Sequence, residues 1–138
     1  MEIIYRRALP SDAEFLAELR WDFRYNSRAG QTVVSRVEFQ AIFSAFIAQA
    51  LERSEWLVWV AEQTGEIIAH VYLHVFQKLP NPYALESYLG YISNVYTKPE
   101  FRSRGVGATL MAQVTDWAKQ QGRMDVLILW RSEESQVF

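Results

Sequence analysis

The sequence has no cysteine among its 138 residues, and this absence limits its chemistry. It excludes disulfide bonds, thiolate metal ligands and a covalent intermediate on cysteine. Histidine is also scarce, because His70 and His74 are the only two, and both lie in the β-rich run "IIAHVYLHVF". On a strand they would lie about 13 Å apart, too far to share one metal ion. We therefore expect no metal site. Either histidine could line an acceptor pocket or simply pack.

The sequence also lacks an excess of positive charge and a long apolar run. Its 14 Lys and Arg against 16 Asp and Glu give a net charge of −2, so no overall positive field attracts nucleic acid. The most apolar helical stretch, "AIFSAFIAQA", is too short to span a bilayer. The first ten residues contain no apolar segment of the signal-peptide kind. We expect a cytoplasmic protein that binds neither nucleic acid nor a membrane.

Apolar residues make up 50% of the sequence and aromatic residues 14%, which is enough for the core of one domain over residues 1–138. Periodicity and turn residues predict the order β-α-α-β-β-β-α-β-α, a mixed sheet with helices on both faces. The expected elements are a strand at 2–8, helices after Ser11 and Ser35, a hairpin over 56–76, a strand at 88–97, a helix at 105–121, a strand at 124–130 and the start of a helix at 132–138.

Local signals fix several of these boundaries. Ser11 with Glu14, and Ser35 with Glu38, have the spacing of a capping box at a helix N-terminus. The second helix then repeats apolar residues at helical spacing, which predicts one buried stripe. Its members are Phe39, Ile42, Phe43, Phe46, Ile47, Ala50 and Leu51. "NSRAGQT", residues 26–32, is expected to be the loop between these two helices.

The stretch "VYTKPEFRSRGVGATL" combines a strand end, two arginines and a glycine-rich helix start. A helix N-terminus offers unpaired backbone N–H groups and partial positive charge. Gly105 and Gly107 remove the Cβ atoms that would keep a ligand from those amides, while Arg102 and Arg104 add forked donors suited to phosphate oxygens. A diphosphate is the ligand that this turn predicts.

Other phosphate and hydrolase motifs do not fit. The sequence has no Gly-x-x-x-x-Gly-Lys-Ser/Thr loop, and "GVGATL" places Leu110 where a dinucleotide-binding fold needs a small residue. It has no Gly-x-Ser-x-Gly elbow, which argues against a serine hydrolase. It also lacks the aromatic string of an RNA-binding sheet.

At this turn the chain resembles the GNAT superfamily of acyl-CoA-dependent N-acetyltransferases. The segment Arg102-Ser103-Arg104-Gly105-Val106-Gly107 matches the family signature Arg/Gln-x-x-Gly-x-Gly/Ala. The resemblance implies a mixed, mostly antiparallel sheet and implies acetyl-CoA as co-substrate. Residues 103–108, which end at Ala108, would bind the CoA diphosphate. The main chain of Val95, Tyr96 and Thr97 would pair with the pantetheine amides like an added strand.

The resemblance implies direct transfer of an acetyl group to an amine of a small molecule or a protein. In the family, the first two helices and their loop, here 26–32, shape the acceptor pocket. Two other hypotheses stay open on the residues alone. The chain could be a non-catalytic acyl-CoA-binding sensor or regulatory module, or a nucleotide-binding interaction domain.

Two departures from the family pattern are visible. Many members have a glutamate base on the fourth strand, whereas residues 87–99 contain no carboxylate. Tyr91 and Ser93 share a face of that strand and could order a water molecule as the catalytic residues. Glu18, Asp22 and Glu86 are alternatives that would act through water or remain solvated.

The second departure is at the C-terminus. "SEESQVF" resembles the opening of the family's last helix, with Ser132 and Ser135 where Asn and Ala are common, and Phe138 comes one position before the expected acid tyrosine. The two C-terminal β-strands of the family are absent. We therefore expect an incomplete domain, or a sheet edge that a partner chain completes as a homodimer.

Overall fold

The computed structural model describes residues 2–28, 32–122 and 124–128 of the chain. Within them, one five-stranded sheet has the order β1-β2-β3-β4-β5. Its strands are β1 Ile4–Arg7, β2 Trp56–Gln63, β3 Glu66–Gln77, β4 Tyr88–Thr97 and β5 Met124–Ile128. The helices are α1 Ala13–Arg28, α2 Arg36–Arg53 and α3 Val106–Gln121. The predicted last helix, 132–138, lies outside the described residues.

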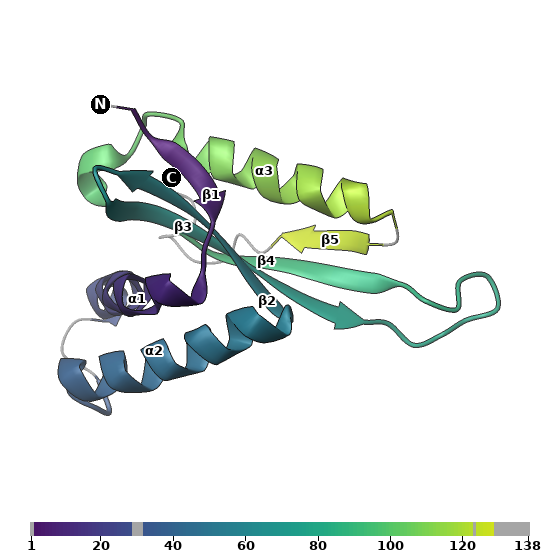
Figure 1. Ribbon diagram of the computed structural model, residues 1–138, viewed down its shortest axis with the longest axis horizontal. Coiled ribbons are helices and arrows are strands. Elements are labelled where there is room, and N and C mark those ends of the chain that lie inside the picture. Colours follow the sequence, from purple (N-terminus) through teal and green to yellow (C-terminus); the bar gives the residue numbers. More distant parts are fainter. Residues whose placement is uncertain (1, 29–31, 123, 129–138) are drawn as a thin grey trace.

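The sheet is mixed and mostly antiparallel, with helices on both faces. Neighbouring strands from β1 to β4 pair antiparallel, whereas β4 and β5 pair in parallel. Figure 1 shows α1 and α2 on one face and α3 on the other. Two hydrophobic clusters fill these layers: Phe23 and Ile47 belong to the first, and Ile92 and Leu110 to the second. The predicted fold class is therefore confirmed.

The predicted hairpin is confirmed as β2 and β3, joined by a two-residue turn. Thr64 and Gly65 occupy this turn with φ angles of 52° and 77°. Two consecutive positive φ values are what a tight turn needs if its twist is to match that of the flanking strands. Glycine accepts such an angle without strain, which is why the Thr-Gly pair predicts the turn correctly.

The predicted cap at Ser11 is wrong. The chain enters α1 through a short 3-10 helix, Pro10–Asp12, and Asp12 carries out the capping instead. Its Oδ2 atom accepts a hydrogen bond of 2.7 Å from the Leu9 N–H. The prediction failed because Ser11 lies inside this 3-10 helix, whereas an N-cap residue directly precedes a helix. At its other end α1 continues to Arg28, so the helix includes the first residues of the predicted loop 26–32.

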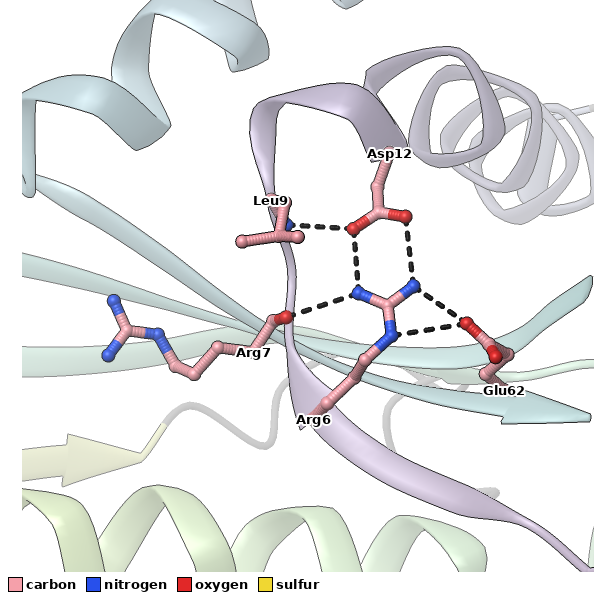
Figure 2. Close-up of polar contacts among 5 residues, drawn as sticks. All are labelled: Arg6, Arg7, Leu9, Asp12 and Glu62. Atoms are coloured by element: carbon pink, nitrogen blue, oxygen red, sulfur yellow. Dashed lines mark hydrogen bonds and ion pairs between the residues drawn. The ribbon is translucent and has the colours of Figure 1, made fainter. Parts of the chain in front are cut away.

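Figure 2 shows the ion pairs that connect β1, the 3-10 helix before α1, and β2. The guanidinium group of Arg6 donates two hydrogen bonds to Asp12, of 2.8 and 2.9 Å, and two to Glu62, of 2.8 and 3.1 Å. The side chain of Asp12 is only 11% exposed. The hydrogen bonds from Arg6 are the main cause that lowers the pKa of the Asp12 carboxyl group. These ion pairs therefore depend on an ionised Asp12.

The cap predicted at Ser35 is confirmed, and it gives a test with a built-in control. The Ser35 hydroxyl oxygen accepts a hydrogen bond of 3.1 Å from the Glu38 N–H at the start of α2. We expect Ser35→Ala to lower the free energy of unfolding by about 1 kcal/mol, as measured by urea denaturation. Ser11→Ala is the matched control and should leave it nearly unchanged. A larger loss from Ser11→Ala would contradict this assignment of the caps.

The apolar stripe predicted for α2 is only partly buried. Ile47 and Ala50 are buried against α1 and the sheet, but Ile42 is 63% exposed and Phe46 is 54% exposed. The apolar residues of this helix spread over more of its surface than its contacts with α1 and β2 cover. None of the helices in the described ranges is long and apolar enough to cross a membrane.

Candidate functional site

The turn between β4 and α3 has an unusual backbone. After β4 ends at Thr97, a 3-10 helix spans Pro99–Phe101, and α3 begins at Val106. Ser103 and Gly105 both have positive φ angles, 64° and 79°. An alternation of left-handed and ordinary residues points successive N–H groups towards one side, which creates a concave site for an anion. A Cβ atom added at Gly105 would meet nothing within 4 Å, so the backbone there is open to a ligand.

The backbone amides of this turn are available for binding. Among the residues that the structure describes, the N–H groups of 103–108 donate no hydrogen bond. The Gly105 carbonyl oxygen, in contrast, already accepts bonds from the Thr109 N–H at 3.0 Å and from the Thr109 hydroxyl at 2.9 Å. Ser103, Arg104, Gly105 and Ala108 are exposed, whereas Val106 and Gly107 are buried. The turn thus keeps unpaired donors while its Gly105 carbonyl oxygen is satisfied internally. Such an arrangement favours an anionic ligand.

The two predicted arginines occupy different positions at this turn. Arg102 donates from Nε to the Thr97 carbonyl oxygen at 2.9 Å, and its guanidinium group lies over the ring of Tyr96. Arg104 is exposed and lies over the ring of Phe101, 5.6 Å from its centre. Arg102 therefore ties the turn to the end of β4, and Arg104 is the more accessible positive charge.

Within the described residues, the end of β4 has an unpaired edge beside this turn. Thr97 and Tyr96 pair with β3 on one side. On the other side, β5 pairs with β4 only from Tyr88 to Ile92 within the described residues. The side chains of Val95, Tyr96 and Thr97 are buried, so the main chain is what this edge presents. An extended chain with amide groups could add here as a further strand.

A β-bulge at Asn94 precedes this edge. His70 pairs with Tyr96, but Tyr72 pairs with Ser93, so β4 carries one extra residue at this point. Asn94 has a φ angle of 55°, and its carbonyl oxygen lies 2.8 Å from Nδ1 of His70. A bulge disrupts the ladder locally and redirects the strand, and bulges are frequent beside active sites.

The predicted catalytic pair lies next to this bulge. Tyr91 and Ser93 are half-buried and lie opposite His74 and Tyr72 on β3. Cross-strand partners share a face, and Tyr72 packs in the hydrophobic cluster under α1 and α2. The Ser93 hydroxyl accepts a hydrogen bond of 3.0 Å from the Asn94 side-chain amide. The role of the pair in ordering water remains a prediction.

The three carboxylates considered as alternative catalytic residues either interact with other side chains or are exposed. Glu86 accepts a hydrogen bond of 2.6 Å from the Tyr88 hydroxyl, and Asp22 forms an ion pair of 3.5 Å with Arg36. Glu18 is exposed on α1. In the described part of the chain, no group of three or more histidine and acidic residues could bind a metal ion.

A polar cluster that the sequence patterns did not reveal lies beneath the bulge. Arg20 donates from Nη1 to the Asn94 side-chain oxygen at 2.5 Å, and both residues line a cavity with Tyr72. Arg20 falls at helical spacing between Leu16 and Phe23, which are both buried. A positive charge on the apolar stripe of a helix was the signal that could have revealed it.

His70 and Tyr72 are also fully buried in this region. Burial and the nearby charge of Arg20 lower the pKa of His70 to about 3, so the imidazole is neutral at physiological pH. Burial raises the pKa of the Tyr72 hydroxyl, which is therefore protonated. His70 consequently cannot act as a proton switch near neutral pH. His74 stacks on Trp56 with ring centres 4.3 Å apart, in the packing role weighed above.

The turn, the open strand edge and the sheet agree with one family. A sequence model of the acetyltransferase (GNAT) family matches residues 13–136. Because this match covers most of the chain, the protein belongs to the GNAT acetyltransferase family. A search of curated protein sequences gave no match.

Solved structures show the same fold. A predicted acetyltransferase from Clostridium acetobutylicum, solved with acetyl-CoA, has a TM-score of 0.78 and 18% identity over 98% of this chain and 85% of that chain. A GCN5-related N-acetyltransferase from Ralstonia eutropha JMP134 has a TM-score of 0.73 and 24% identity over 98% of this chain and 87% of that chain. An aminoglycoside acetyltransferase from a soil metagenomic sample, solved with sisomicin, has a TM-score of 0.69 and 16% identity over 94% of this chain and 78% of that chain. At these identities the likeness establishes the fold.

Proposed function

We propose that this protein transfers an acetyl group from acetyl-CoA to an amine of a small molecule or a protein, within one domain. The observation that carries this proposal is the turn 103–108, which combines unpaired amides with the charges of Arg102 and Arg104. This set of donors fits a diphosphate. The adjoining edge of β4 at Val95–Thr97 fits the amide groups of pantetheine, because both are extended chains with alternating donors and acceptors.

The reaction proposed is a direct attack. The amine nitrogen attacks the thioester carbonyl carbon, the C–S bond breaks, and CoA leaves as a thiolate that takes up a proton. The nitrogen loses a proton to water that Tyr91 and Ser93 order. The bulge at Asn94 disrupts the ladder, and a main-chain N–H group that it frees would suit the developing negative charge on the carbonyl oxygen.

A second candidate is an acyl-CoA-binding module without catalysis. It is favoured by the lack of any carboxylate in residues 87–99, where a base would be expected. Among the similar solved structures, one is named an aminoglycoside acetyltransferase and another a ribosomal-protein-alanine N-acetyltransferase. The fold by itself therefore does not determine the acceptor.

Two measurements on the whole chain separate these possibilities. We expect calorimetry to detect saturable binding of acetyl-CoA, and we expect thiol release when a panel of primary amines is added. Binding without thiol release from any amine would favour the non-catalytic module. The absence of binding by well-folded protein would reject both candidates.

A further inference from the structure

Arg20 lies in an unusual environment for a positive charge. Its side chain is half-buried between α1 and the sheet, and burial is the main cause that lowers its pKa. Among the described residues, no carboxylate forms an ion pair with it, and its only hydrogen-bond partner there is the neutral side chain of Asn94. A guanidinium group has five N–H donors, so most of them remain available. Charges of this kind are normally paired.

Arg20 lines a cavity between the helices and the sheet. The cavity has a volume of about 130 Å³ and includes Arg20, Asn94 and Tyr72 in its lining. The remaining lining residues are apolar: Phe43, Phe46, Ile47 and Trp56. One water molecule occupies about 30 Å³ in the liquid, so the cavity has room for a small organic group. One side of such a group would be polar and the other apolar.

Tyr72 provides an independent sign of a missing polar partner. This residue is 4% exposed, and its hydroxyl group has no hydrogen-bond partner among the described residues. A buried hydroxyl without a partner costs free energy, and native proteins rarely leave one. Tyr72 lines the same cavity as Arg20, and the hydroxyl is protonated there. A hydrogen-bond acceptor in the cavity would therefore satisfy it together with Arg20.

The cavity adjoins the place where the acyl group would arrive. Asn94 lines the cavity and directly precedes Val95, whose main chain begins the proposed pantetheine edge. An amine held in the cavity would lie on the same stretch of β4 as the thioester. The polar group recognised by Arg20 would then be close to the attacking nitrogen in the acceptor molecule.

We infer that this cavity is the acceptor site and that it selects a small amine bearing a carboxylate near the amine and a short apolar group, as in a free apolar amino acid. This inference rests on the proposed acetyl transfer. The carboxylate would accept hydrogen bonds from Arg20 and Tyr72, and the apolar group would contact Phe43, Ile47 and Trp56. Amines with several positive charges would be disfavoured because Arg20 repels them.

A matched pair of substrates tests the inference. Valine and valinamide share the side chain and the amine and differ in the carboxylate. We expect kcat/KM for valine to exceed that for valinamide by about tenfold or more, because a charge-assisted bidentate contact is lost in the amide. The amine of valinamide is the less basic of the two and is more often neutral. A site indifferent to the carboxylate would therefore use valinamide equally well or better, which would overturn the inference. The dipeptide valylglycine, whose carboxylate is distant from the amine, should resemble valinamide and not valine.

Arg20→Gln tests the residue itself. It should lower kcat/KM for valine by about tenfold or more while it changes that for valinamide by less than about threefold. Arg24 is exposed and lies one turn further along α1. The control variant Arg24→Gln removes the same charge and should leave kcat/KM for both valine and valinamide nearly unchanged. Equal losses for the two substrates in Arg20→Gln would contradict selection of a carboxylate.

A binding measurement keeps the inference separate from the proposed activity. N-acetylvaline, added without CoA, should produce a saturable shift of the Arg20 Nε–H signal in NMR spectra, and N-acetylvalinamide should not. If acetyl-CoA does not bind but this shift occurs, acetyl transfer fails and the anion site stands. If acetyl-CoA binds and is turned over but neither N-acetylvaline nor valine is preferred over its amide, the anion site fails.

Discussion

Reversing both arginine charges at the turn, in the variant Arg102→Glu with Arg104→Glu, is expected to weaken CoA binding by more than about 100-fold. Each guanidinium group that contacts a phosphate contributes about 1.5–3 kcal/mol, and a factor of ten in affinity corresponds to about 1.4 kcal/mol. A carboxylate at either position would also repel the diphosphate. Isothermal titration calorimetry with CoA measures this loss directly.

The two single variants should differ in a second property. Arg104 is exposed and forms no hydrogen bond within the described chain, so Arg104→Glu should weaken binding and leave the melting temperature unchanged. Arg102→Glu removes the bond to the Thr97 carbonyl oxygen and should lower the melting temperature as well. Lys119→Glu, about 20 Å further along α3, is the control for net charge. Unchanged affinity in the double variant, or an equal loss in Lys119→Glu, would reject the turn as the phosphate site.

The variant Asp12→Asn is expected to lower the free energy of unfolding by about 2 kcal/mol at pH 7. It removes the negative charge that receives two hydrogen bonds from Arg6 and one from the Leu9 N–H (Figure 2). Breaking a fully buried ion pair costs about 3–5 kcal/mol and an exposed one less than about 1, and Arg6 is 30% exposed. The expected loss lies between these limits. Urea denaturation at several pH values is the appropriate measurement.

The pH dependence identifies the cause of that loss. The pKa of Asp12 is lowered in the folded state, so its contribution is fully present above the unfolded value of about 4 and is lost as the pH falls through the folded value. The gap between wild type and Asp12→Asn should therefore be constant from pH 5 to 7 (about 2 kcal/mol) and should shrink below about pH 4. Buried His70 also destabilises the protein in acid, but it does so equally in the wild type and in Asp12→Asn. A gap that is independent of pH would contradict the ion-pair explanation, and the exposed Asp116→Asn should behave as wild type.

The elements that the sequence predicted correctly are those with local signals at their ends. Pro99 follows the strand that ends at Thr97, and Gly122 closes the helix that ends at Gln121. The helix predicted from residue 105 begins at Val106, directly after Gly105 with its positive φ angle. Each of these boundaries depends on the conformational limits of one residue, so the sequence is sufficient to find it.

The features that the sequence did not reveal depend on contacts between distant segments. The bulge at Asn94 arises from the pairing of β4 with β3, and the residues next to Asn94 in the sequence contain no signal that predicts it. The cavity at Arg20 forms only when α1, α2 and the sheet meet, because its lining comes from all three. Periodicity describes one helix at a time, so it does not show which charge lies under which neighbour.

The most direct test of the central claim is a titration of the ¹⁵N-labelled protein with CoA, followed by NMR of the backbone amides. We expect saturable shifts that are largest for the amides of 103–108, because these N–H groups would donate to the diphosphate oxygens. Saturable binding with no change at these amides, and with the largest shifts elsewhere, would contradict it.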